Sequence, residues 1–384
     1  MSKVNLLESR ILQIGKFYPI RGGVEKVMYD LMLGLSKRKI HCDMLCASTE
    51  NFASGDLRIN DYARVIIVPT QVKLASTMLA PAMVSKLREI NHLYDAIHIH
   101  HPDPMACLAL FLSGYKGKIV LHWHSDIVKQ KKLLLLYKPL QNWLIKRADI
   151  IVGTSPTYVH ESPFLQKVQH KITHIPIGVE SLQPNERISS TIRKKYEGKK
   201  VIFALGRLVE YKGYHHMIQA MKLLDDNYHL IIGGKGPLKD DLLALISNLR
   251  INNRVELINY ISDEEVPSYY DICDVFCLSS TQKTEAFAIV QIEAMSLGKP
   301  IVSTHIEGSG VSWVNADQVS GLVVEKENPT ALANAIRVLI EDKELYQKLG
   351  DGARNRYEMS FTEQSMIDKT LSVYKSIGLL STPN

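Results

Sequence analysis

The sequence predicts an α/β protein built from two doubly wound, Rossmann-like domains that face a central cleft. The chain has 384 residues, which is long for one domain. Short β-branched or apolar runs alternate with amphipathic segments of helical length, a pattern typical of parallel sheets covered on both faces. This alternation pauses once, in a polar stretch from 181 to 200, and then starts again.

The first half of the chain contains most of the predicted strands. Their apolar cores read RILQI, HCDMLCA, RVIIVP, DAIHIH, KIVLHW and DIIVGT. The segment after Gly23 shows a helical period, because its apolar residues recur on one face. These residues are Val24, Val27, Met28, Leu31 and Leu35.

After the polar stretch, further strands are predicted at KVIFALG, YHLIIGG, RVELIN, DVFCLSS and KPIVSTH. We therefore expect an N-terminal domain over residues 1–180 and a C-terminal domain over residues 181–361. A last helix within residues 362–384 is expected to pack back on the first domain. Ligands of doubly wound sheets bind beyond the carboxyl ends of the strands, so chemistry is expected there.

Composition narrows the class of protein. Hydrophobic residues make up 46% and charged residues 22%, as in an ordinary globular chain. A net charge of +6 permits an anionic ligand or a membrane surface, but leaves no broad basic field for nucleic acid. The five cysteines form no Cys-x-x-Cys and are expected to be reduced, buried thiols.

Two observations bear on location. The N-terminal residues have neither the apolar core nor the small-residue cleavage site of a signal peptide. The apolar run MACLALFL at 105–112 is too short to span a bilayer. We expect a cytoplasmic protein.

The turn after the first strand carries Gly22 and Gly23 directly before a helix. Backbone amides and the helix dipole favour an anion at such a position, although a plain turn explains the pair as well. Neither a G-x-G-x-x-G nor a Walker A sequence occurs, and GGKGPLKD at 233–240 lacks the third glycine.

Arg207 and Lys212 lie in GRLVEYKG, between a predicted strand and a predicted helix. Two permanent cations at such a junction suit a diphosphate, and arginine can grip two oxygens at once. A solvated surface pair is the alternative.

The segment TEAFAIVQIEA holds two glutamates in apolar surroundings. The spacing places Glu285 in a loop and Glu293 about two turns into a helix. The backbone amides of Phe287, Ala288 and Ile289 open that helix and can hold a phosphate, while the carboxylates can accept hydrogen bonds from sugar hydroxyls. For Glu293, the alternative is an exposed helix carboxylate.

Taken together, Gly22–Gly23, GRLVEYKG, GGKGP and TEAFAIVQIEAMSLGKPIV resemble, in this order, the family-4 glycosyltransferases of GT-B fold. The resemblance covers nearly the whole chain. It implies transfer of a sugar from a nucleotide diphosphate-sugar with retention of anomeric configuration, without a metal ion or other cofactor. No Asp-x-Asp occurs in the chain, which agrees with a diphosphate held by Arg, Lys and helix N-termini.

The resemblance also assigns roles to residues. Arg207 and Lys212 would neutralise the leaving diphosphate, and Glu293 would hold the ribose hydroxyls. Glu285 with the amides that follow it would hold the donor sugar and phosphate. Further donor contacts are expected at Gly22, Gly23, Gly234 and Ile261. Ile261 belongs to the segment after the RVELIN strand, where contacts to the base of the nucleotide are expected.

This sequence departs from the family's pattern at one place. The family usually has glycines on both sides of the phenylalanine, where this chain has Ala286 and Ala288. A methyl group is compatible with the same amide contacts only if φ stays negative.

Histidines gather at two strand ends, His98, His100 and His101 at one and His122 and His124 at the other. A metal site is one interpretation, since imidazoles are common ligands. Alternation argues against it, because it turns His101 to the face opposite His98 and His100. The resemblance places a histidine at the position of His124, facing the donor sugar.

The segment from 127 to 148 has six cations and no acid. Basic amphipathic segments of this kind bind anionic membranes, so a peripheral position on the inner membrane face is one expectation. A helix packed by its leucines, with a solvated basic face, is the other.

The segments HSDI, TSPTYVHESPFL and GSGVSWVN resemble bacterial enzymes that build O-antigen or capsule units on a lipid carrier, several of them mannosyltransferases. A glycan or lipid-linked acceptor is therefore expected, with GDP-mannose as the leading donor and UDP-hexoses behind it. Two alternatives stay open: a nucleotide-sugar epimerase of the same architecture, and a non-catalytic sugar-binding protein.

Overall fold

A computed structural model describes residues 9–20, 22–49, 52–74, 77–127 and 131–380 of the chain, without the side chains of residues 74, 77 and 131–134. The chain divides into two compact units. Unit 1 comprises Met1–Ile177 and Glu363–Asn384, and unit 2 comprises Gly178–Thr362. The sequence had placed the corresponding boundaries at 180 to 181 and at 361 to 362. No helix in the described part of the chain is long and apolar enough to cross a membrane.

Unit 1 is built on an eight-stranded sheet with the order β10-β9-β8-β7-β1-β2-β4-β3. Every neighbouring pair is parallel except β3 and β4. The strands are β1 (Arg10–Tyr18), β2 (His41–Ser48), β3 (Gly55–Asn60), β4 (Ala63–Val68), β7 (Ala96–His101), β8 (Lys118–Trp123), β9 (Ile150–Gly153) and β10 (Ile172–His174). A separate hairpin joins β5 (Val72–Leu74) to β6 (Thr77–Leu79).

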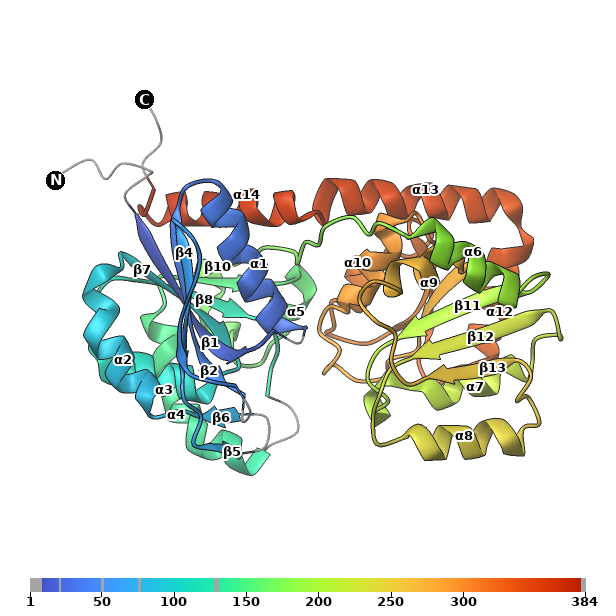
Figure 1. Cartoon of the computed structure of the whole chain (residues 1–384), viewed down its shortest axis with the longest axis horizontal. Coiled ribbons are helices and arrows are strands. Elements are labelled where there is room, and N and C mark those ends of the chain that lie inside the picture. The colour runs from blue at the N-terminus through green and yellow to red at the C-terminus, as the bar shows by residue number, and fades with distance from the viewer. Residues whose placement is uncertain (1–8, 21, 50–51, 75–76, 128–130, 381–384) are drawn as a thin grey trace. The chain divides into compact units, whose positions relative to one another are not determined.

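Helices cover both faces of this sheet (Figure 1). Those of unit 1 are α1 (Val24–Lys37), α2 (Ala82–Ile90), α3 (Pro104–Ser113), α4 (Lys131–Arg147), α5 (Pro156–His160) and α14 (Glu363–Ser376), with 3-10 turns η1 (Asn91–Leu93) and η2 (Gln166–Lys171). Helices α1 and α14 lie on one face, and α2, α3 and α4 lie on the other. The apolar stripe predicted for α1 contacts the core, where Val27, Met28, Leu31 and Leu35 are buried.

The C-terminal helix α14 packs against α1. A side chain at Gly34 would obstruct this contact, because a Cβ there would lie 2.4 Å from Cδ1 of Ile367. Arg38 forms an ion pair of 2.6 Å with Asp368, and the Tyr374 hydroxyl lies 2.8 Å from Nδ1 of His98. The last helix thus completes the core of unit 1 although it follows the whole of unit 2 in the chain.

Unit 2 has a six-stranded parallel sheet with the order β13-β12-β11-β14-β15-β16. Its strands are β11 (Lys200–Leu205), β12 (Tyr228–Gly233), β13 (Val255–Ile258), β14 (Val275–Leu278), β15 (Ile301–His305) and β16 (Gly321–Glu325). Its helices are α6 (Glu186–Lys195), η3 (Glu210–Lys212), α7 (Tyr214–Met221), α8 (Lys239–Asn248), α9 (Val266–Ile272), α10 (Ile289–Ser296), α11 (Val311–Val314), α12 (Pro329–Glu341) and α13 (Lys343–Ser360). Figure 1 shows α6, α9 and α10 on one side of the sheet and α7 and α8 on the other.

The predicted fold class is confirmed, and each predicted strand core coincides with an observed strand. The strands that the sequence did not reveal are β3, β5, β6, β10 and β16. The domains were expected to join near residues 178–200, and this segment contains helix α6, which belongs to unit 2.

Among its parallel strands, each sheet reverses its strand order once. In unit 1 the reversal lies between β1 and β7, and in unit 2 it lies between β11 and β14. At such a point the loops leaving the two strands turn to opposite faces of the sheet and leave room for a ligand between them. The loops that follow β11 and β14 therefore frame the expected site of unit 2.

Candidate active site

The loops after β11 and β14 bring Lys212 and Glu285 into contact. Nζ of Lys212 lies 2.5 Å from Oε2 of Glu285, and the side chains are only 9% and 10% exposed. The Ser280 hydroxyl donates to the same carboxylate oxygen at 2.8 Å, and the Ser309 hydroxyl donates to the backbone carbonyl of Glu285. Two charges predicted from separate motifs thus compensate each other inside unit 2.

Gly213 explains why the two loops can approach so closely. Its φ is +63°, and a Cβ there would lie 2.2 Å from the carbonyl oxygen of Ser279. The Ser279 hydroxyl donates to the carbonyl of Lys212 at 2.9 Å, and the Thr281 amide donates to the carbonyl of Tyr211 at 2.8 Å. The β11 loop is therefore fixed to the β14 loop by hydrogen bonds to the carbonyls of Tyr211 and Lys212.

Arg207 has different surroundings. It is exposed, and its Nη2 donates to the Tyr211 hydroxyl at 3.2 Å. The two cations predicted for a diphosphate therefore differ: Lys212 is buried against a carboxylate, whereas Arg207 is at the surface of the same loop.

Gly234 and Ile261 lie at the carboxyl ends of the next strands. Gly234 has a φ of +147°, and a Cβ there would lie 1.9 Å from the carbonyl oxygen of Gly206. The loop after β12 consequently touches the loop that carries Arg207. Ile261 is buried after β13, and its Cδ1 lies 2.6 Å from the point where Gly233 would carry a Cβ.

The start of helix α10 leaves donors free. The helix begins at Ile289 with Ala288 as its N-cap. Among the described residues, none accepts a hydrogen bond from the backbone amides of Phe287, Ala288 or Ile289. Three donors at a helix N-terminus, next to a buried ion pair, suit an anionic oxygen.

Ala288 does not have the negative φ that a methyl-bearing residue was expected to need here. Its φ is +62° and its ψ is +77°, so it occupies the left-handed region that favours glycine. This chain therefore keeps a glycine-type backbone at this position and bears the strain of the methyl group.

Glu293 lies about one turn into α10, rather than the two turns expected, because the helix begins only at Ile289. The carboxylate is half-buried and accepts a hydrogen bond of 2.8 Å from the Tyr270 hydroxyl. Burial raises the pKa of Tyr270, and the neighbouring carboxylate adds to this, so Tyr270 keeps its proton and remains the donor. The interpretation as an exposed helix carboxylate is wrong, because Glu293 is half-buried. Tyr270 was not singled out from the sequence, where it reads as an apolar residue of α9.

In unit 1, Gly22 and Gly23 precede α1 as expected. Their φ values are +120° and +62°. A Cβ at Gly22 would meet open space, and one at Gly23 would only approach a carboxylate oxygen of Glu25. These two positions therefore favour glycine because of their positive φ, and not because a side chain would lack room.

The histidines lie where the alternation predicted. His101 stacks on Trp123 with ring centres 3.7 Å apart, on the face opposite His98, which contacts Tyr374. His98, His100 and His122 offer ring nitrogens within 4.8 Å of one another. Both nitrogens of His100 are already in hydrogen bonds, at 2.7 Å to Gln13 and 2.8 Å to His124. A hydrogen-bonded cluster therefore fits this geometry better than a metal site.

Burial keeps these histidines neutral. It lowers the pKa of His98, His100 and His124 well below the usual value, and neighbouring imidazoles add to this effect. For His122 burial alone lowers the pKa to about 3. At neutral pH each ring therefore carries one proton, on one of its two nitrogens.

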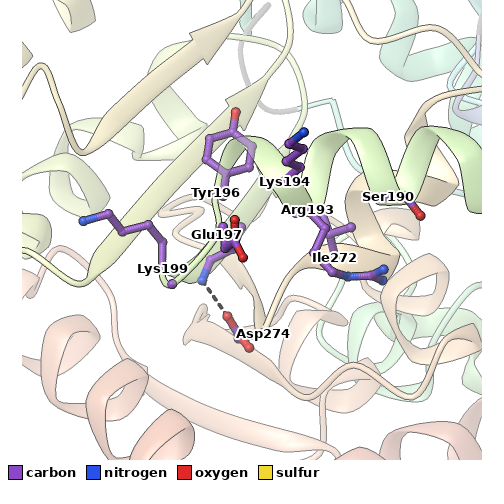
Figure 2. A pocket seen from close by; sticks show the side chains of 10 residues that line it. Ser190, Arg193, Lys194, Tyr196, Glu197, Lys199, Ile272 and Asp274 are labelled. Atoms are coloured by element: carbon purple, nitrogen blue, oxygen red, sulfur yellow. Dashed lines mark hydrogen bonds between the residues drawn. The ribbon is translucent and has the colours of Figure 1, made fainter.

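A cavity of about 630 Å³ lies elsewhere in unit 2. It is lined by charged side chains that include Arg193, Lys199 and Asp274 (Figure 2). The Asp274 carboxylate accepts a hydrogen bond of 2.6 Å from the Val201 amide. Because Val201 is the second residue of β11 and Asp274 directly precedes β14, this cavity is at the amino ends of the strands, away from Lys212 and Glu285.

Comparisons with known proteins bear on the identity of this arrangement. A model of Glycosyltransferase Family 4 matches residues 21–181, and one of Glycosyl transferases group 1 matches residues 185–356. O-antigen chain mannosyltransferase C of Escherichia coli is 30% identical over 373 residues, which cover 96% of this chain and 98% of that protein. The chain belongs to the group 1/family 4 glycosyltransferases.

Other relatives agree with this assignment. D-rhamnosyltransferase WbpZ of Pseudomonas aeruginosa is 31% identical over 294 residues, 76% of each chain. The capsular polysaccharide biosynthesis glycosyltransferase CapM of Staphylococcus aureus is 30% identical over 336 residues, covering 83% of this chain and 86% of that one. Membership favours a transferase over the epimerase and the sugar-binding protein considered above.

Solved structures confirm the GT-B fold of this family-4 glycosyltransferase. Anabaena HepE in complex with UDP matches with a TM-score of 0.76 and 22% identity, over 96% of this chain and 100% of that one. WaaG, involved in lipopolysaccharide biosynthesis, matches with a TM-score of 0.69 and 17% identity, over 94% of this chain and 99% of that one.

The strain at Ala288 gives a testable prediction. Ala288→Gly should leave the enzyme more stable than Ala286→Gly by about 1 kcal/mol, because only Ala288 has a positive φ. Both substitutions give the unfolded chain the same added freedom, so Ala286→Gly is the matched control. Urea unfolding measures the difference. Equal stability of the two variants would contradict a strained Ala288.

Proposed function

We propose that this glycosyltransferase transfers a hexose, with mannose from GDP-mannose as first candidate, to a glycan or lipid-linked acceptor of bacterial surface polysaccharide. The transfer would retain anomeric configuration and need no metal ion. The observation that supports this best is the buried Lys212–Glu285 pair next to the free amides that open α10. The choice of sugar rests on the relatives, which include an O-antigen mannosyltransferase and a D-rhamnosyltransferase.

The leaving group defines what the site has to do. A departing nucleoside diphosphate gains negative charge in the transition state, and preorganised donors lower the barrier most when they are aimed at that charge. The guanidinium of Arg207, the ammonium of Lys212 and the amides of Phe287 to Ile289 are the donors available in unit 2. We propose that they bind the diphosphate together.

The two glutamates receive different roles. Glu285 holds Lys212 and is proposed to meet the donor sugar. Glu293, oriented by Tyr270, is proposed to accept hydrogen bonds from the ribose hydroxyls. Ile261 and Gly234 would line the nucleoside side of the donor. Gly22, Gly23 and His124 of unit 1 remain proposed contacts to the diphosphate and the sugar.

Product analysis tests the proposal. The enzyme is supplied with GDP-mannose or a UDP-hexose, a lipid-linked acceptor and EDTA, and both nucleoside diphosphate and glycosylated acceptor are measured. GDP release matched by α-mannosylated acceptor in EDTA is the expected result. Transfer from a UDP-hexose alone would replace mannose, and activity that needs added manganese would overturn the metal-free mechanism.

The two cations should respond differently to substitution. Lys212→Ala leaves the buried Glu285 carboxylate unpaired, which should lower the free energy of unfolding by about 3–5 kcal/mol. Arg207→Ala removes an exposed side chain and should change stability by less than about 0.5 kcal/mol, yet lower kcat by roughly 100- to 1000-fold. Urea unfolding and turnover of both variants check this. A stable, fully active Arg207→Ala enzyme would exclude Arg207 from the diphosphate site.

The glutamates should separate binding from turnover. Glu293→Ala removes a contact made equally in ground and transition states, so free nucleoside diphosphate should bind about 10- to 100-fold more weakly. Glu285→Gln keeps an oxygen that accepts from Ser280 but removes the negative charge that pairs with Lys212. It should lower kcat more than it raises the donor KM. Calorimetric titration with GDP or UDP, alongside turnover, measures both. Equal loss of diphosphate binding in the two variants would refute this division of roles.

A membrane contact is the second part of the proposal. Of the segment 127–148, residues 128–130 lie outside the described residues, and helix α4 begins at Lys131. Large apolar side chains are exposed over α3 and α4, which we call the α3–α4 surface. Its members are Leu108, Phe111, Leu112, Leu135 and Leu136.

Cations accompany these apolar side chains. Leu135 and Leu136 are 71% and 81% exposed, and Lys138 and Lys146 are exposed on the same helix. The ring of Phe111 meets that of Trp143 edge to face at 4.9 Å, which joins α3 to α4. Exposed leucines beside lysines suit an anionic lipid surface, where each cation contributes roughly 1 kcal/mol.

Vesicle binding tests the membrane contact. The Lys138→Gln, Lys146→Gln double variant should bind anionic vesicles about 30-fold more weakly at low salt, because about 2 kcal/mol of attraction is lost. The Leu135→Ser, Leu136→Ser variant should bind more weakly at any salt concentration. From the basic sequence of the segment, replacing Lys129, Lys131 and Lys132 by glutamine is also expected to weaken vesicle binding; the side chains of these residues lie outside the described part of the structure.

The control for this experiment is the Lys343→Gln, Lys348→Gln variant, which removes the same charge from exposed positions of α13 in unit 2. It should bind like the wild type. If it weakens vesicle binding as much as the α4 variant, net charge rather than the α3–α4 surface is responsible.

A further inference from the structure

A continuous chain of hydrogen bonds in unit 1 joins β1, β7 and the residue that directly follows β8. The side-chain amide of Gln13 donates to the carbonyl of Met28 at 3.0 Å. Oε1 of Gln13 lies 2.7 Å from Nε2 of His100, and Nδ1 of His100 lies 2.8 Å from Nε2 of His124. Gln13 and His100 are fully buried, and His124 is 5% exposed. The chain ends at the carboxyl edge of the sheet, beside the reversal between β1 and β7.

The direction of each hydrogen bond follows from the first one. A backbone carbonyl only accepts, so the amino group of Gln13 has to face Met28 and its carbonyl oxygen has to face His100. That oxygen also only accepts, so Nε2 of His100 carries the proton. His100 is neutral, since burial lowers its pKa well below the usual value, and its Nδ1 is therefore a lone-pair acceptor. Nε2 of His124 must then carry the proton that is donated to His100.

The ring geometry supports a well-formed bond between the two histidines. Their planes differ by 15°, and the ring centres are 5.1 Å apart while the two nitrogens are 2.8 Å apart. The centres are farther apart than the nitrogens by about the width of a ring, so the rings lie edge to edge in nearly one plane. The N–H of His124 thus points along the lone pair of His100.

The other ring nitrogen of His124, Nδ1, carries no proton. His124 is neutral, because burial and the neighbouring imidazoles lower its pKa, and its one proton is on Nε2. Nδ1 takes part in no hydrogen bond with a described residue. It is therefore an acceptor at the carboxyl edge of the sheet.

We propose that Gln13 and His100 are positioning residues that hold His124 in one tautomer, so that Nδ1 of His124 accepts a hydrogen bond from a hydroxyl group of the donor sugar. This inference rests on the proposed function, which places His124 at the sugar. It adds the polarity of that contact: the site takes a hydroxyl that donates and rejects a substituent that can only accept. The selectivity comes from a carbonyl of α1, transmitted through three side chains.

Donor analogues test the polarity. Each hydroxyl of the transferred sugar is replaced in turn by hydrogen or by fluorine, which accepts weakly but cannot donate. At one position both analogues should lower kcat/KM by a similar factor of roughly ten, and this factor should vanish in His124→Ala. A fluorinated analogue that restores activity over the deoxy analogue at that position would mean that His124 donates, and would overturn the inference.

Substitutions within the chain test the positioning. Gln13→Leu and His100→Phe should each lower kcat/KM for the donor about tenfold, while the Kd of free GDP or UDP stays unchanged because neither Gln13 nor His100 is among the proposed contacts of the nucleoside diphosphate. Nitrogen-15 spectra of the His124 ring should show an unprotonated Nδ1 in the wild type and a mixture of tautomers in Gln13→Leu. A protonated Nδ1 in the wild type would overturn the inference without any assay of activity.

His98→Phe is the matched control. His98 is equally buried on the same face of β7, but its hydrogen bond runs to Tyr374 instead of His124. It should leave the His124 spectrum unchanged. If it alters that spectrum as Gln13→Leu does, the effect is general packing and the inference fails. Absence of transfer from every sugar nucleotide would instead overturn the proposed function, whereas normal transfer without any His124-dependent hydroxyl would overturn only this inference.

Discussion

The contact between Lys212 and Glu285 is the interaction on which the organisation of unit 2 depends. Two opposite charges can stay buried only if each satisfies the other, because an isolated one would cost several kcal/mol. Meeting this requirement fixes the loop after β11 against the loop after β14, with Gly213 allowing the approach. The same requirement brings the N-terminus of α10 to the place where the strand order reverses. The anion site proposed for unit 2 therefore depends on satisfying one ion pair.

Much of the fold was predictable because it depends on local patterns. Apolar runs gave the position of most strands, and the stripe from Val27 to Leu35 gave the buried face of α1. Strands β3 and β10 escaped, since neither carries a run of buried apolar residues. The motifs around Arg207 and Glu285 gave the family. They did not reveal that Lys212 would be neutralised by Glu285, because that contact joins residues far apart in sequence.

Side-chain partners were the least predictable part of the site. Tyr270 reads as one more apolar residue of α9, and only the packing of α9 near α10 turns its hydroxyl to Glu293. The start of α10 was also missed, because the left-handed backbone at Ala288 delays the helix and a methyl-bearing residue gives no sign of it. Alternation placed the histidines on the correct faces of β7. The direction of their hydrogen bonds depends on Met28, in a different element.

The burial of so many imidazoles also makes unit 1 sensitive to mild acid. Five histidines, His98, His100, His101, His122 and His124, have a pKa lowered by burial in the folded chain. Below about pH 6.5 these histidines bind protons in the unfolded chain but not in the folded chain. The free energy of unfolding is therefore highest above that pH and falls as the pH drops. A histidine that stays neutral in the folded chain costs about 1.4 kcal/mol for each pH unit below that value, which is large beside an ordinary domain's stability of roughly 5–15 kcal/mol. Unit 1 is therefore expected to lose stability in mild acid.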